Sequence, residues 1–372
     1  MNKSIINKNI SHVTPAEFFI PQRRATDRIT ALWALSEAGL GGILHAFKIP
    51  FTGLIIGSSA VIFMTLLACF SDKKNTILRA TLLVLIVKGF VSPHTPFTAY
   101  LAVGLQGLFG EFIFRWIKYP GIAAPLLGAL ALFQSGIQKI IILTVVFGNN
   151  LWNSIDLFTN YILGQLFISI NYSFPMSISA LFIVLYVGIH VAAGVSAGIW
   201  APLFSAKIKN ELKNKPALLN LPADADKTNN NPKKKKRKRP WHKFSNMMLL
   251  LIISSILILS YIFPVFEKNQ GTAALLMAAR SVLVMTVWYF ILGPLMITKL
   301  RSYLNRKKMH YSPEIESIIG LFPLFRKIIR QSWTVSGNEK GIGRIDRFMT
   351  LLFLQILTVE TTADDIKDSS GT

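Results

Sequence analysis

The strongest constraint on this chain is a series of long apolar blocks that carry almost no charge. Blocks such as 51–70 and 178–203 reach the roughly 20 residues that a helix needs to cross a bilayer core. Only 16% of the 372 residues are charged, whereas about a quarter are charged in soluble domains. The sequence therefore predicts an all-α integral membrane protein, a polytopic bundle of transmembrane helices.

Eight blocks have the length and hydropathy expected of transmembrane helices, in a group of six followed by a group of two. The segment 151–170 is also apolar, but its first half carries Asn153, Asp156 and Asn160, so we interpret it as interfacial or re-entrant. The predicted spans are 31–47, 51–70, 76–91, 97–115, 121–147, 178–203, 246–265 and 273–298.

Polar segments separate these groups and define five regions. In the last region, apolar residues recur at helical spacing, which predicts an amphipathic helix that lies on the membrane or packs against a partner helix. These residues are Ile315, Ile318, Ile319, Phe322, Phe325, Ile329 and Trp333. The regions are a cytoplasmic N-terminal tail (1–30), a six-helix membrane domain (31–204), a basic disordered linker (205–245), a two-helix membrane segment (246–298) and a cytoplasmic amphipathic tail (299–372).

The placement of lysine and arginine predicts the orientation of the chain. Alternation over eight spans puts the basic segments on one side, and the loops on the other side hold only Lys48 and Lys268. Because cytoplasmic loops are enriched in Lys and Arg, we expect a multi-pass protein of the cell membrane with both termini in the cytoplasm. The basic run 233–239 follows the same rule, and no folded basic domain surrounds it, so we expect no nucleic-acid partner.

The first span carries a stripe of small residues, Ala34, Ala38 and Gly42, spaced four apart. Such a stripe lets another helix approach closely, either within the chain's own bundle or from a partner. The span is followed by the sequence IPF at 49–51, and a later stretch reads VSPHTPFTAYLAVGLQGLFG. With the six-span block, these motifs resemble the membrane-embedded substrate-binding subunits of energy-coupling-factor (ECF) vitamin transporters over residues 30–204.

That resemblance implies a small-molecule binder that has no motor of its own. Ala34 and Ala38 would face a transmembrane coupling subunit, and separate nucleotide-binding subunits would supply the energy. The sequence contains no G-x-x-x-x-G-K-[ST] motif and therefore no P-loop. Residues 205–372 depart from the family pattern. They would replace part of the coupling subunit, although the Ala-Arg-Gly motifs of that subunit are absent.

Polar residues in apolar spans mark candidate functional positions because burying them in a membrane is costly. Those expected at one depth, in the outer half of the six-helix block, are His45, Lys88, His94, Lys139, Asn150, Trp152 and His190. They predict a pocket for a small anionic or heteroaromatic solute, with Trp152 covering a ring. The alternatives are that both lysines snorkel to the interface, that His45 and His94 are loop-edge residues, and that His190 is a hydrogen-bonded core histidine.

Other residues give weaker indications. Glu37 is placed toward the cytoplasmic half of the first span, where it would pair with a basic residue of another helix or take part in proton coupling. The histidine spacing does not fit a zinc site, and the single Cys69 excludes an intramolecular disulfide and any multi-cysteine metal site. We therefore expect no metal and no cofactor.

Three classes of function remain open after this reading. The first is a transporter subunit that captures a small, vitamin-like solute, and the second is a non-transport membrane scaffold or biogenesis factor that acts through its basic linker and tail. A membrane enzyme is disfavoured, because the only close acidic pairs are Asp224/Asp226 and Asp364/Asp365, in polar segments. A pocket in the outer half of the six-helix block would favour the transporter subunit, and a filled bundle would favour the scaffold.

Overall fold

The computed structural model describes residues 22–41, 52–92, 95–166, 177–214 and 270–359. These residues form helices and no strand, as the sequence predicts. Five helices are long and apolar enough to cross a membrane: Thr52–Phe70, Phe97–Trp116, Pro120–Phe147, Ile178–Lys213 and Ala279–Met309. The predicted span 246–265, most of the basic linker, and the residues His45, His94 and Gly42 lie outside the described residues.

Four consecutive helices follow the predicted spans closely, since Pro96, Pro120 and the polar turn at 71–75 separate the apolar blocks. They are α3 (Thr52–Phe70), α4 (Thr76–Val91), α5 (Phe97–Trp116) and α6 (Pro120–Phe147). Many large apolar side chains on α5 and α6 stay exposed, among them Leu108, Phe112 and Ile141. An apolar outer surface of this kind suits contact with lipid.

The first helix begins earlier than predicted. α1 (Gln22–Leu35) continues directly into a π-helical turn, η1 (Ser36–Leu40), so the helix begins ahead of residue 31, where the first span is predicted to start, and includes the last residues of the predicted N-terminal tail. A contact with a distant part of the chain explains why the helix begins early. Arg28 is 5% exposed, and its Nη1 donates a hydrogen bond to the carbonyl oxygen of Ile356 at 2.7 Å. A cation is stabilised at a helix C-terminus, which explains how a charged turn is buried here.

The helix of the sixth predicted span, 178–203, continues past residue 203. α8 (Ile178–Asn214) runs through residues 205–214, which were predicted to belong to a disordered linker. Ile208 and Leu212 are buried there, and Lys207 forms an ion pair with Asp346 at 2.6 Å. Packing of the apolar residues against the C-terminal helices therefore orders a stretch whose composition alone favours disorder.

α6 and α8 form the closest helix pair of the bundle, and small residues allow their approach. A Cβ built on Gly194 would lie 2.1 Å from the carbonyl oxygen of Gly128, and one on Gly198 would lie 2.3 Å from that of Ala124. The backbones therefore touch, as in small-xxx-small contacts of membrane helices.

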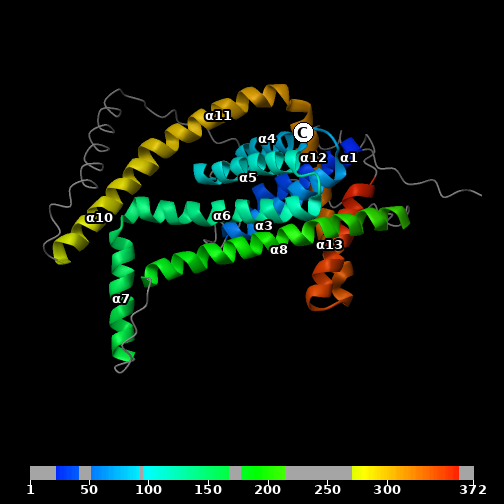
Figure 1. The fold of residues 1–372 in the computed structure, drawn as a ribbon. Coiled ribbons are helices and arrows are strands. Elements are labelled where there is room, and N and C mark those ends of the chain that lie inside the picture. Colours follow the sequence, from blue (N-terminus) through cyan, green and yellow to red (C-terminus); the bar gives the residue numbers. More distant parts are fainter. Residues whose placement is uncertain (1–21, 42–51, 93–94, 167–176, 215–269, 360–372) are drawn as a thin grey trace, which may run out of the picture.

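The segment between α6 and α8 is itself a helix. α7 (Asn150–Leu166) lies across the ends of α6 and α8 in Figure 1, instead of running alongside them. Asp156 accepts hydrogen bonds from the Ser179 backbone N–H at 2.6 Å and from its hydroxyl at 2.8 Å. The carboxylate thus caps the N-terminus of α8, where free N–H groups and the helix dipole favour a negative charge.

The C-terminal helices complete the fold. α10 (Gln270–Val287), the π-helical turn η2 (Trp288–Leu292) and α11 (Gly293–His310) form one continuous arc in Figure 1, so the predicted boundary at 298 falls inside a helix. After them come α12 (Ser312–Val335), a short 3₁₀ turn, η3 (Ser336–Asn338), and α13 (Gly341–Thr358).

The predicted amphipathic helix is α12, and its apolar face lies inside the molecule. α12 packs against α1, α4 and α13, which buries Ile315, Ile318, Phe322 and Phe325. The partner for this face is therefore found in the chain's own bundle, while Trp333 remains about half exposed. The C-terminal region is joined to the N-terminal helices as one packed body.

Candidate functional site

A cavity of about 1080 Å³ lies between η1, α3, α4, α5, α6, α7 and α8. Its volume is at the upper end of the range for small-molecule sites. Most of its wall is apolar, with polar groups from every one of these elements. The polar and aromatic side chains on the wall are Glu37, Thr52, Lys88, Thr98, Gln106, Ser135, Gln138, Lys139, Trp152, Tyr186 and His190.

A buried ion pair stands on one side of this cavity. The Lys88 Nζ donates a hydrogen bond to Glu37 Oε2 at 2.6 Å, and the two side chains are only 3% and 0% exposed. The other oxygen of the carboxylate, Oε1, is buried with no hydrogen-bond partner among the described residues. A buried acceptor without a partner is costly, so a hydrogen-bond donor that reached this oxygen would be stabilised there.

The backbone places Glu37 in an unusual conformation. Glu37 lies in the π-helical turn η1, which directly follows α1. Turns of this kind are rare in helices and occur frequently at functional sites. Together with the early start of α1, this turn brings Glu37 to the level of Lys88, so Glu37 pairs with a basic residue of another helix, one of the two roles expected from the sequence.

Lys139 and Gln138 stand on the α6 side of the cavity. Lys139 is exposed, and no ion pair to a described carboxylate neutralises it. The Gln138 amide donates to the carbonyl oxygen of Thr98 at 3.0 Å and accepts from Gln134 at 2.6 Å. The amide is thus held in position between α5 and α6, while the Lys139 ammonium is available to an anion.

Aromatic rings line the remaining side. The Trp152 indole N–H donates to the Thr144 hydroxyl at 3.0 Å, which attaches the first turn of α7 to α6. His190 is 1% exposed, its Nδ1 lies 2.9 Å from the Tyr186 carbonyl oxygen, and the two rings are 4.4 Å apart. The sequence left open whether His190 is a hydrogen-bonded core histidine or a residue of the pocket. In the structure it is buried and hydrogen-bonded, and it also lines the cavity.

Four of the predicted pocket residues, Lys88, Lys139, Trp152 and His190, line this one cavity. Asn150 starts α7 and does not line it. Lys88 does not snorkel, since it is buried and paired with an acid. Other polar residues of the wall, such as Gln106 and Gln138, were not predicted from the sequence. Each is a polar residue within a long apolar helix, and this feature could have identified them.

The alanine stripe is covered by the chain itself. Ala34 is 0% and Ala38 5% exposed, and α1 packs against α3, α4, α12 and α13. Of the two interpretations of the stripe, packing within the chain's own bundle is the one realised in this structure.

Metal chemistry finds no support in the described part of the chain, which contains no group of three or more His, Cys, Asp or Glu side chains able to hold an ion. Comparisons with protein-family models, curated proteins and solved structures find no match for this chain. The molecule is thus defined by its own features: a helical protein with five helices able to span a membrane, and a cavity that contains a buried ion pair.

Proposed function

We propose that this chain is a transporter subunit that binds a small solute in the cavity between η1 and α8. The observation that carries the proposal is the Glu37–Lys88 pair, with its unsatisfied Oε1, on the wall of a large cavity. Polar groups inside membrane proteins usually mark solute or ion pathways. A purely structural core would be filled with apolar side chains.

The charges of the wall favour a particular kind of solute. Glu37 neutralises Lys88, so Lys139 is the cation left to attract a negative group. The free Oε1 acceptor favours a ring N–H or amine donor on the same molecule, and Trp152 and Tyr186 offer faces for an aromatic ring. These features suit a heteroaromatic anion of vitamin size.

The proposal includes an arrangement in the membrane. Eight spans, with both termini in the cytoplasm, follow from the one-sided distribution of Lys and Arg. In that arrangement the cavity lies in the outer half of the bundle, where a solute from outside the cell would enter. α7 would then lie along the outer interface, as its crosswise direction suggests (Figure 1).

We further propose that separate subunits supply the energy, as the likeness to ECF substrate-binding subunits implies. In that family the helix with the alanine stripe meets a coupling subunit. Here α12 packs against α1, the helix that carries the stripe. This contact supports the idea that the C-terminal region takes the place of part of a coupling subunit.

Retention of a solute tests the proposal. The full-length protein is purified from membranes, and small molecules released on unfolding are identified by mass spectrometry. Lys139→Met removes the exposed cation at the cavity, and Lys118→Met removes another exposed lysine outside it. We expect retention to fall at least tenfold in Lys139→Met and to persist in Lys118→Met, with equal thermal stability for both.

An empty cavity in every preparation, or equal retention in both variants, would contradict the proposal. In that case the alternative, a membrane scaffold or biogenesis factor, would gain. Nucleotide-binding subunits that co-purify with the chain would support the dependence on separate energising subunits, whereas solute uptake by the chain alone would refute it.

A further inference from the structure

A second, smaller cleft lies at the start of α4. It has a volume of about 430 Å³ and is enclosed by the first turns of α1, the turn between α3 and α4, and Tyr311. Its floor is formed by buried residues, including Thr30 and Leu83, and its rim is formed by charged ones. Segments far apart in the sequence therefore build one concave, polar-rimmed surface.

The rim carries a strong positive charge. Four basic side chains, Arg23, Lys73, Lys74 and Arg79, line the cleft together with the carboxylate of Asp27. Arg79 is bound to Glu314, which lies outside the lining, and Arg23 approaches Asp27 at 4.0 Å. No ion pair joins Lys73 or Lys74 to a carboxylate of the described residues, so neither ammonium group is held in direct contact with an acid.

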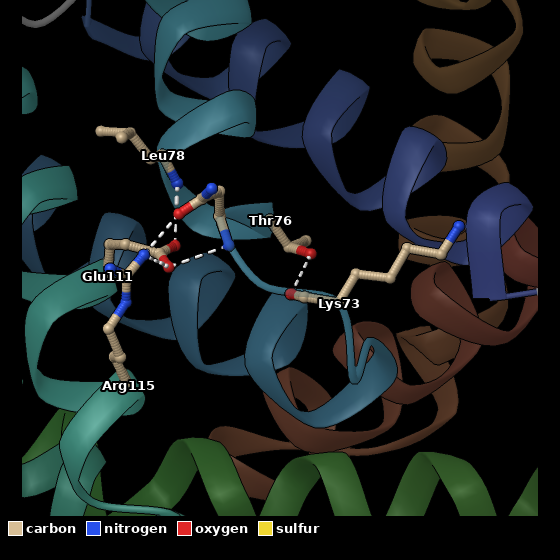
Figure 2. A network of polar contacts seen from close by, with 6 residues as sticks. Lys73, Thr76, Leu78, Glu111 and Arg115 are labelled. Carbon is tan, nitrogen blue, oxygen red and sulfur yellow. Dashed lines mark hydrogen bonds and ion pairs between the residues drawn. The ribbon is translucent and has the colours of Figure 1, made fainter.

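A carboxylate of α5 close to this turn is already engaged. Glu111 accepts hydrogen bonds from the backbone N–H groups of Asn75 at 2.9 Å and Leu78 at 3.3 Å, and it pairs with Arg115 at 3.1 Å. Figure 2 shows this network and the Lys73 side chain, which extends away from Glu111 toward α1. Glu111 thus caps α4 and does not neutralise the lysines.

The turn that presents the lysines is held by hydrogen bonds. The Thr76 hydroxyl donates to the Lys73 carbonyl oxygen at 2.8 Å, and the Lys73 N–H donates to the Ser71 hydroxyl at 3.2 Å. On the other wall, the Gln22 amide donates to Asp72 at 2.8 Å, which links α1 to the same turn. A fixed turn reduces the entropy that would be lost when an anion binds.

We propose that this cleft binds a phosphate group. Two ammonium groups outside any ion pair of the described residues, two guanidinium groups and several hydroxyls match a phosphate, which offers negative oxygens to many donors. An anionic phospholipid headgroup and a soluble phosphate compound share this chemistry. In the proposed arrangement the cleft opens at the cytoplasmic surface, where anionic lipids attract basic residues. The site is separate from the solute cavity and does not depend on its function.

The test compares two matched double variants of the full-length protein. Lys73→Gln/Lys74→Gln removes both lysine charges of the cleft, and Lys118→Gln/Lys340→Gln removes two exposed lysines elsewhere. Each protein is titrated with phosphatidylglycerol and with phosphatidylcholine in detergent, and bound lipid is counted by native mass spectrometry. Inorganic phosphate is titrated in a parallel series and followed by thermal shift.

We expect the wild type and the Lys118/Lys340 variant to bind one phosphatidylglycerol in preference to phosphatidylcholine. The Lys73/Lys74 variant should bind it about 30-fold more weakly, from the loss of two charges near the surface. Saturable binding of inorganic phosphate that the Lys73/Lys74 variant alone loses, without lipid preference, would support a soluble phosphate ligand instead. Equal binding of both probes by all three proteins, or equal losses in both variants, would overturn the proposal.

Discussion

The buried pair between Glu37 and Lys88 gives the sharpest prediction for stability. Lys88→Met keeps most of the side-chain volume and removes the charge, so the Glu37 carboxylate is left at 0% exposure without a partner on either oxygen. Breaking a buried ion pair from one side costs about 3–5 kcal/mol. Total folding stabilities are about 5–15 kcal/mol, so the expected loss is a large part of the whole.

The same reasoning predicts a rescue. In Glu37→Met/Lys88→Met both charges are gone and two apolar side chains of similar volume fill the space. Replacing a buried pair in this way is about neutral or stabilising. The double variant should therefore regain most of the stability that either single variant loses, with a coupling free energy of about 3 kcal/mol between the two positions.

Equilibrium unfolding in mixed micelles tests both predictions. The wild type, both single variants and the double variant together form a double-mutant cycle. A loss below about 1 kcal/mol for Lys88→Met would mean that the two groups do not depend on each other. Equal losses in the double variant and the single variants would mean that the cost arises from packing and not from charge. Either result would refute the argument from the 2.6 Å contact.

Two further outcomes follow from the backbone and the charge pattern. Gly194→Leu, which forces a side chain against the α6 backbone, should cost about 3 kcal/mol or more, whereas Gly188→Leu, with open space around its Cβ position, should be tolerated in the same unfolding assay. The second outcome concerns orientation and is tested in a Cys69→Ala background. A cysteine at Asn149 should react with a membrane-impermeant thiol reagent in intact cells, and a cysteine at Asn229 should not. Labelling at Asn229 would reverse the proposed orientation.

The helices that follow hydropathy alone were predictable, and the misplaced ends have tertiary causes. α3 through α6 begin and end where apolar blocks meet proline or polar turns. The start of α1 was missed because a charged turn indicates an exit from the membrane, yet here Arg28 is buried as a cap for α13. The end of α8 was missed because Ile208 and Leu212 are ordered by a helix much later in the sequence.

The candidate site was predictable in part for the same reason. Lys88, Lys139, Trp152 and His190 fall in or beside helices whose bounds follow hydropathy, so their common depth could be inferred. The pairing of Glu37 with a basic residue was expected, but Lys88 could not be identified as the partner, because the position of Glu37 along the bundle depends on where α1 starts. Hydropathy and residue spacing do not indicate a π-helical turn. This turn sets the direction of the Glu37 side chain.

The ion pair is better explained by recognition than by stability. Two apolar side chains would fill the same space at no loss of folding free energy, so stability gives no reason for charges at these positions. On the wall of a cavity, however, the pair offers polar atoms that two apolar side chains would not. A donor on the solute would then reach Oε1, the one carboxylate oxygen that Lys88 leaves unsatisfied. On the proposed function, the pair is therefore the polar contact by which the cavity selects its solute, and Lys139 supplies the charge that draws the solute in.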